Sequence, residues 1–219
     1  MNNIDLARYI DHTLLKPNIT TGQIDELCGE ALKYNFASVC IPPYFVNTAK
    51  KNLEDSPSVK VCTVIDFPFG YDFASAKVES IKKAIYYGAD EIDAVINIPA
   101  LKNNDWKTIK YELEAMRTIT KINDKVLKII FETCYLSREE IERLARACLK
   151  YEVDYLKTST GFGTGGATVE DVKLMKSIVG DKAKIKASGG IRTKEKALEM
   201  INEGASRIGA SAGISIILS

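Results

Sequence analysis

The sequence predicts a closed (β/α)8 TIM barrel of the α/β class, formed by a single catalytic domain over residues 1–219. Short runs of β-branched and aromatic residues alternate eight times with longer helical patterns, which is typical of βα units on a parallel sheet. A chain of 219 residues accommodates eight such units, at the short end of the size range for this fold. No Pro/Ser-rich linker, low-complexity tract or change of composition divides the chain. An open doubly wound sheet is the alternative.

The predicted strands are short, as is usual for strands in globular proteins. In chain order they cover Ile10–Thr13, Phe36–Ile41, Lys60–Asp66, Glu91–Ile98, Val126–Glu132, Val153–Thr158, Lys184–Ser188 and Arg207–Ala210. Capping boxes predict several helix starts, because a hydroxyl accepts a bond from a free amide and a side chain three residues on returns one. These boxes are expected at Thr20 with Gln23, Ser137 with Glu140, and Thr168 with Asp171.

Composition points to small-molecule partners. Thirty basic residues stand against twenty-nine acidic ones, so no global field favours nucleic acid or a membrane. The N-terminus lacks the apolar segment of a signal peptide, and no apolar run approaches the roughly 18 residues of a membrane span, which predicts a cytoplasmic protein. Five cysteines without a CxxC pair and the single histidine, His12, argue against a disulfide framework, a zinc site and a protease triad.

Two lysines are expected at the carboxyl ends of neighbouring strands, where barrel enzymes place their active residues. Period-two alternation puts Lys157 at the end of the sixth strand, on the same face as Tyr155. Lys186 occupies the corresponding late position in the seventh strand. Because neighbouring strands lie about 4.8 Å apart, the two ammonium groups are expected within roughly 6 Å of each other.

Two charges at that separation repel each other by about 2.8 kcal/mol at an effective dielectric constant near 20. Partial desolvation acts in the same direction, so one amine is expected to be unprotonated and nucleophilic near neutral pH. Such an amine is suited to forming an imine with a carbonyl compound. The alternative is that Lys157 and Lys186 reach solvent or pair with carboxylates.

The fourth strand carries two acids, Glu91 and Asp93, on the parity that faces the barrel axis. Asp93 is expected to relay protons during carbanion chemistry, or else to form an ion pair with a neighbouring lysine. Lys128 lies on the face of Glu132, four residues further along the fifth strand, and is expected to pair with it.

Three polar loops are candidates for binding an anion, because glycine-rich loops expose backbone amides and a following helix adds its positive end. They are Thr160-Gly161, Ser188-Gly189-Gly190 and Gly209-Ala210-Ser211, which follow the sixth, seventh and eighth strands. Barrels frequently bind phosphate after the seventh and eighth strands. The string GFGTGG lacks the GK[ST] ending of a P-loop and is equally consistent with a flexible turn. Three further residues are expected to complete a polar cup: Asp11, Thr13 and Cys40.

Seven segments, taken in order, resemble the deoxyribose-phosphate aldolases, a family of class I aldolases. They are IDHTLLKP (10–17), SVCI (38–41), GADEID (88–93), KIIFET (128–133), YLKTSTG (155–161), KASGGIRT (186–193) and RIGAS (207–211). The resemblance runs through nearly the whole chain, and the KTSTG and K-x-SGGIRT motifs are its most specific part.

The resemblance implies reversible cleavage of 2-deoxy-D-ribose 5-phosphate to D-glyceraldehyde 3-phosphate and acetaldehyde, with neither a metal nor a cofactor. It implies that Lys157 is the Schiff-base nucleophile, Lys186 the lysine that perturbs it, and Asp93 the proton donor and acceptor. The phosphate would be held by Thr160, Gly161, Gly189, Gly190, Gly209 and Ser211, while Asp11, Thr13 and Cys40 would line the sugar end.

Three departures from the family pattern bear on turnover more than on reaction type. Phe162 stands where some members have a lysine, Ala212 replaces a second serine, and no tyrosine follows Tyr155. The rival functions are a class I aldolase for another sugar phosphate and a sugar-phosphate binding protein without activity. A homodimer is the assembly expected by default, because symmetric pairs are the commonest oligomers.

Overall fold

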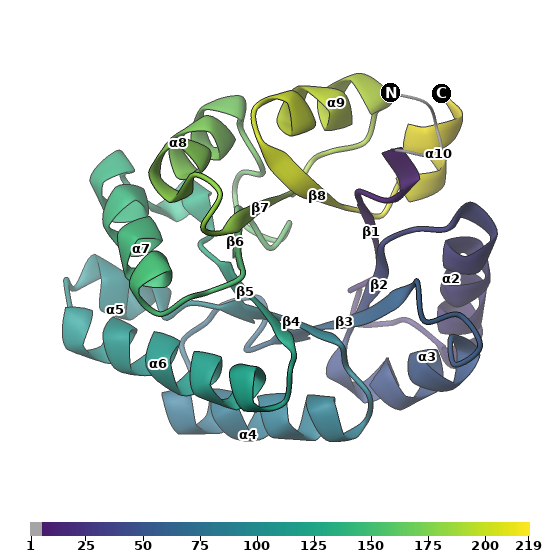
Figure 1. The fold of residues 1–219 in the computed structure, drawn as a ribbon, viewed down its shortest axis with the longest axis horizontal. Helices are drawn as coiled ribbons and strands as arrows, with labels where there is room; N and C mark the ends of the chain where they lie inside the picture. The colour runs from purple at the N-terminus through teal and green to yellow at the C-terminus, as the bar shows by residue number, and fades with distance from the viewer. Residues whose placement is uncertain (1–5) are drawn as a thin grey trace.

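The computed structural model describes residues 6–219, which form a closed barrel of eight parallel strands (Figure 1). Each strand pairs with the next, and β1 pairs with β8 to close the sheet. The strands are β1 (Ile10–Thr13), β2 (Ser38–Ile41), β3 (Lys60–Ile65), β4 (Glu91–Val95), β5 (Val126–Ile130), β6 (Tyr155–Lys157), β7 (Lys184–Ser188) and β8 (Ala205–Ala210). The predicted fold class is confirmed.

The helices surround the barrel on its outside (Figure 1). They are α2 (Thr21–Tyr34), α3 (Val46–Asn52), α4 (Ala74–Tyr86), α5 (Ile98–Lys102), α6 (Trp106–Ile122), α7 (Arg138–Lys150), α8 (Val169–Val179), α9 (Lys194–Asn202) and α10 (Gly213–Leu218), with 3-10 turns at Pro43–Phe45 and Thr133–Tyr135. Within the described residues, the helices are too short or too polar to cross a membrane.

Local chemistry explains where some elements begin and end. The predicted fourth strand continued to Ile98, but β4 stops at Val95 because the Asn97 side chain accepts a bond from the Ala100 amide at 2.9 Å and starts α5. The capping boxes at Thr20 and Ser137 are confirmed. At the start of α8, the Thr168 hydroxyl accepts a bond from the Asp171 amide at 3.0 Å, which is one half of the predicted box.

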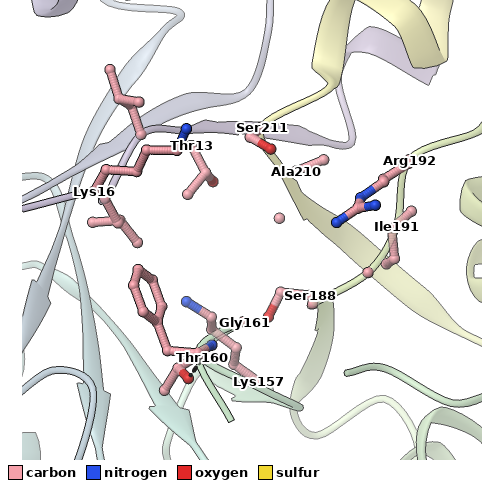
Figure 2. A pocket seen from close by; sticks show the side chains of 16 residues that line it. Thr13, Lys16, Lys157, Thr160, Gly161, Ser188, Ile191, Arg192, Ala210 and Ser211 are labelled. Carbon is pink, nitrogen blue, oxygen red and sulfur yellow. Dashed lines mark hydrogen bonds between the residues drawn. The ribbon is translucent and has the colours of Figure 1, made fainter. Parts of the chain in front are cut away.

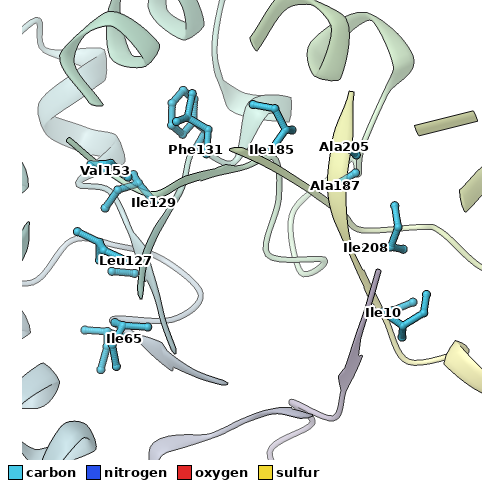
Figure 3. Packing of buried hydrophobic residues seen from close by; sticks show 14 of the residues in the cluster. Ile10, Ile65, Leu127, Ile129, Phe131, Val153, Ile185, Ala187, Ala205 and Ile208 are labelled. Atoms are coloured by element: carbon cyan, nitrogen blue, oxygen red, sulfur yellow. The ribbon is translucent and has the colours of Figure 1, made fainter. Parts of the chain in front are cut away.

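The main apolar core lies between the strands and the helices (Figure 3). On β5, Leu127 and Ile129 belong to this layer, and on β7 Ile185 and Ala187 do; all four side chains are fully buried. Because side chains alternate across a strand, the residues between them point to the barrel axis. Strand alternation therefore divides the protein into an apolar outer layer and a second, inner set of side chains, many of which are charged.

Candidate active site

Lys157, the last residue of β6, lies beside Lys186, the middle residue of β7, and the strand register pairs them directly. The Lys157 Nζ donates a hydrogen bond to Asp93 Oδ2 at 2.8 Å, and the Lys186 Nζ donates to the same oxygen at 2.7 Å. Because both nitrogens contact one oxygen, they lie close to each other, within the roughly 6 Å that the sequence predicted. Both side chains are almost inaccessible to solvent. The structure thus brings together the three residues expected to be catalytic.

Asp93 is surrounded by positive charge. Its second oxygen, Oδ1, accepts a bond from Lys128 Nζ at 2.9 Å and from the Cys62 thiol at 3.1 Å. Burial alone would raise the pKa of Asp93, but the ammonium groups of Lys128, Lys157 and Lys186 outweigh burial and hold that pKa well below its ordinary value. Asp93 is therefore a carboxylate that accepts hydrogen bonds throughout the working range of pH.

Lys128 does not pair with Glu132, contrary to the prediction. Its ammonium group contacts Glu91 Oε2 at 2.5 Å as well as Asp93. Strand β5 ends at Ile130, and Glu132 has a left-handed backbone with a φ of 56°, so the alternation that placed both residues on one face stops before Glu132. The Glu132 carboxylate instead accepts bonds from the amide and the hydroxyl of Thr160, in the loop after β6.

Lys186 has a second carboxylate partner, Asp11 on β1, at 2.5 Å. Burial alone would lower the pKa of Lys186, but the carboxylates of Asp11 and Asp93 raise it well above its ordinary value. Arg207 on β8 forms ion pairs with Asp11 and with Glu91. The motif RIGAS included Arg207, but no local pattern indicated these contacts, which cross the barrel.

A cavity of about 310 Å³ opens above Lys157. Lys157 points into this cavity, together with side chains from the loops that follow several strands (Figure 2). It is lined by seven of the nine residues expected to bind substrate: Thr13, Thr160, Gly161, Gly189, Gly190, Gly209 and Ser211. The other two, Asp11 and Cys40, lie outside the cavity lining and are fully buried.

The cavity has a positive lining that the sequence reasoning missed. Lys16, from the loop after β1, and Arg192, from the loop after β7, line it with Lys157, and none of its lining residues is acidic. The Arg192 guanidinium group points into the cavity (Figure 2). Both residues belong to the motifs IDHTLLKP and KASGGIRT. Each lies just beyond the end of a strand, and this position could have identified it as a cavity residue from the sequence. Lys16 and Arg192 thus supply cations to the cavity that Phe162 also lines.

Two glycines bring the loops after β6 and β7 into backbone contact. A Cβ on Gly166 would lie 2.2 Å from the carbonyl oxygen of Gly189, and Gly189 itself has a φ of 90°. Only glycine satisfies both demands without displacing the backbone. This contact places Gly161 and Gly190 on the wall of one cavity, with the amides of their loops near its positive side chains.

One group of side chains in the described part of the chain has the spacing of metal ligands: Cys40, Cys62 and Asp93, whose ligand atoms lie within 4.8 Å of one another. Both oxygens of Asp93 already accept bonds from ammonium groups. A divalent cation there would meet three lysine charges at close range, so this group fits a metal poorly. A hydrogen bond with Cys62 lowers the pKa of Cys40 to about 7, whereas burial raises the pKa of Cys62 well above its ordinary value.

The comparisons identify the class of protein. Residues 6–218 match the model of the DeoC/LacD family of aldolases. The chain is 51% identical over 214 residues to the deoxyribose-phosphate aldolase of an Exiguobacterium species, covering 98% of this chain and 96% of the relative. It is likewise 51% identical over 214 residues to the enzyme of that name from Finegoldia magna, covering 98% and 99% of the two chains.

A solved structure agrees with these sequence relatives. The tetrameric deoxyribose phosphate aldolase from Aeropyrum pernix superposes with a TM-score of 0.91 at 28% identity, covering 99% of this chain and 91% of that one. The chain belongs to the DeoC/LacD aldolase family, and the family expected from its motifs is confirmed. It is therefore an aldolase, an enzyme that breaks and forms carbon–carbon bonds.

Proposed function

We propose that this protein is a deoxyribose-phosphate aldolase in which Lys157 forms a Schiff base with 2-deoxy-D-ribose 5-phosphate. The observation that carries the proposal is the contact of Lys157 and Lys186 with one oxygen of Asp93, at the base of a cavity lined by cations. The family and the names of the relatives agree with this chemistry.

The reaction begins when the neutral amine of Lys157 adds to the aldehyde carbon, C1, of the open-chain sugar phosphate. Loss of water gives an iminium ion, which withdraws electrons from C2. Removal of the proton from the C3 hydroxyl breaks the bond between C2 and C3 and releases glyceraldehyde 3-phosphate. The electron pair of that bond remains on Lys157 as an enamine. Protonation of the enamine at C2 and hydrolysis release acetaldehyde and restore the amine.

Asp93 holds the two lysines beside the substrate as an ionised carboxylate, which differs from the proton donor that the resemblance implies. Its carboxylate contacts Lys157 and Lys186 at hydrogen-bond distance, and the pKa of Asp93 lies well below its ordinary value. Asp93 therefore stays ionised: it orients the two lysines and offsets the positive charge of the iminium ion, while water carries the proton to C2. Lys186, whose pKa is raised, remains charged beside it.

The phosphate end of the substrate fits the opposite part of the cavity. Arg192 and Lys16 supply positive charge, Ser211 supplies a hydroxyl, and Gly189 and Gly190 supply a compact backbone. Charged donors of this kind recognise phosphate oxygens strongly. Thr13 then faces the hydroxyl groups of the sugar, while Asp11 acts through its contact with Lys186.

Borohydride trapping with acetaldehyde, followed by peptide mass spectrometry, tests the proposal. We expect an ethyl adduct on Lys157 in the wild type and no adduct in Lys157→Arg, which retains the charge but cannot form the imine. An adduct on Lys186 or Lys128 would overturn the assignment. A wild-type protein with neither adduct nor activity would be a sugar-phosphate binding protein, and preference for another donor carbonyl would indicate a different class I aldolase.

The remaining expectations extend the proposal. We infer that residues 1–219 act as one catalytic domain, that the enzyme works without a cofactor, and that its place of work is the cytoplasm. A homodimer is the proposed assembly, although the relative from Aeropyrum pernix is named as a tetramer. Sedimentation of the purified chain distinguishes these assemblies.

A further inference from the structure

Six charged side chains inside the barrel form a closed ring in which cations and carboxylates alternate. Asp11 contacts Lys186 at 2.5 Å, Lys186 contacts Asp93 at 2.7 Å, Asp93 contacts Lys128 at 2.9 Å, and Lys128 contacts Glu91 at 2.5 Å. Arg207 closes the ring through ion pairs with Glu91 and Asp11. This charge ring consists of Arg207, Asp11, Lys186, Asp93, Lys128 and Glu91, and its formal charges cancel.

Lys157 is not a member of the charge ring, so its positive charge is not cancelled. Each cation of the charge ring contacts two carboxylates, whereas among the described residues Lys157 has one carboxylate contact, Asp93, which it shares with Lys128 and Lys186. A protonated Lys157 is thus a surplus positive charge in a site that is almost closed to solvent. It also faces the cavity, where the proton can leave.

We propose that Arg207 and Glu91 are positioning residues that set the charge beneath Lys157 and so control how readily its amine forms the imine. Neither residue contacts the cavity; each acts through the charge ring. The inference rests on the proposed role of Lys157 in imine formation, and it goes further by assigning functions to two side chains at the base of the ring.

The members of the charge ring come from β1, β4, β5, β7 and β8, and further titratable groups lie near it on β2, β3 and β6. Titratable groups contact or face it from β1 (Asp11), β2 (Cys40), β3 (Cys62), β4 (Glu91, Asp93), β5 (Lys128), β6 (Tyr155), β7 (Lys186) and β8 (Arg207). The aromatic side chain of Tyr155 lies 5.9 Å from the Arg207 guanidinium group and 5.8 Å from the Lys128 ammonium, both members of the charge ring, and 5.6 Å from the ammonium of Lys184. Cys40, with a pKa of about 7, is a second titratable group near Asp93.

The test uses two substitutions that remove opposite charges. Arg207→Met leaves the charge ring with a surplus negative charge, which stabilises the Lys157 ammonium. The acid limb of the pH profile, where kcat/KM rises with pH, should therefore move to higher pH by about one unit. Glu91→Gln leaves a surplus positive charge, so the limb should move to lower pH by a similar amount. The double variant is neutral again and should return close to the wild-type position.

The measurement is the pH dependence of kcat/KM for unphosphorylated 2-deoxy-D-ribose, because this substrate has no phosphate that titrates. All variants are also prepared with Cys40→Ser, which removes the titration of that thiol. Arg207→Lys keeps the charge and should keep the wild-type limb. Lys121→Met removes an exposed charge, whose side chain is 61% accessible, and should leave the limb unmoved.

Shifts in the same direction for Arg207→Met and Glu91→Gln, or no shift in either, would overturn the proposal. If Arg207→Met does not fold, Glu91→Gln alone must still move the limb to lower pH, and Arg207→Lys must not. Borohydride trapping of each variant separates the two levels of inference. An adduct on Lys157 with unmoved limbs contradicts the charge ring, whereas a wild-type adduct on another lysine contradicts the proposed function.

Discussion

Leu127 and Lys128 are neighbours on one strand, but they lie in two regions that differ in the free energy of burying a side chain. Leu127 lies in the apolar layer under the helices, whereas Lys128 lies inside the barrel against two carboxylates, and both are fully buried. Burying a leucine side chain stabilises the fold by about 1.5–3 kcal/mol. Burying an ammonium costs several kcal/mol, which its ion pairs must offset. The apolar outer layer therefore stabilises the fold, whereas the charged side chains of the interior serve catalysis.

Substitutions in the outer layer should therefore affect stability, and substitutions in the interior should affect turnover. A buried ion network is weak evidence for stability, because well-packed apolar side chains of similar volume often do as well or better. The interior charges nevertheless occupy space that many barrels fill with branched apolar residues. Substitutions in the two regions should consequently separate unfolding free energy from activity.

The largest expected effect is the loss of activity in Lys157→Met. We expect the rate of sugar-phosphate cleavage to fall by about 10⁴-fold or more, because the imine cannot form. The unfolding free energy should stay the same or rise, since a surplus buried charge has been removed while Asp93 keeps two lysine partners. Steady-state kinetics and urea unfolding check both statements. Lys173→Met, which removes a lysine whose side chain is 73% accessible, is the matched control and should change neither quantity.

The opposite pattern is expected for Ile129→Ala, in the outer layer. The substitution creates a cavity between β5 and the helices and should lower the unfolding free energy by about 2–5 kcal/mol. The kcat/KM of the folded protein should stay within about twofold of the wild type. A stability loss below about 0.5 kcal/mol would contradict the assignment of the core to this layer.

Acid should act on the interior more than on the outer layer. The folded-state pKa values of Asp93 and Asp11 lie below their ordinary values, so both groups contribute stability above the unfolded pKa near 3.9 and lose it as pH falls toward the folded pKa. We expect the unfolding free energy to decrease below about pH 4, by about 1.4 kcal/mol per pH unit for each such group. In Asp93→Asn the decrease should be shallower, as urea titrations at several pH values will show. An equally steep decrease in this variant would be contrary to the account.

The smallest effect is expected at the mouth of the cavity. Arg192→Met should raise the KM for the sugar phosphate by about tenfold or somewhat more, because a charged donor to phosphate is lost. The kinetics with unphosphorylated 2-deoxy-D-ribose should be unchanged, which serves as the internal control. Equal losses with both substrates would place Arg192 in the chemistry and remove it from phosphate binding.

Residue periodicity predicted the parts of the site that depend on single strands. Alternation and strand register were sufficient to pair Lys157 with Lys186, because parallel neighbours in a barrel bring late positions together. The partner of Lys128 was predicted wrongly because the left-handed backbone at Glu132 ends the strand pattern, and no local signal announces such a residue. The contacts of Arg207 depend on closure of β8 against β1 and on reach across the barrel to β4, which only the assembled fold determines.

Lys157 carries a surplus charge beside a charge ring whose formal charges cancel, and Lys186→Leu tests the effect of that ring most directly. This variant leaves Asp93 and Asp11 with one cation fewer, so the Lys157 ammonium should be held more firmly. We predict that the acid limb of kcat/KM for 2-deoxy-D-ribose moves to higher pH by about one unit or more, with trapping still on Lys157. A limb that stays in place, or moves to lower pH, would contradict the electrostatic control of the nucleophile by its neighbours.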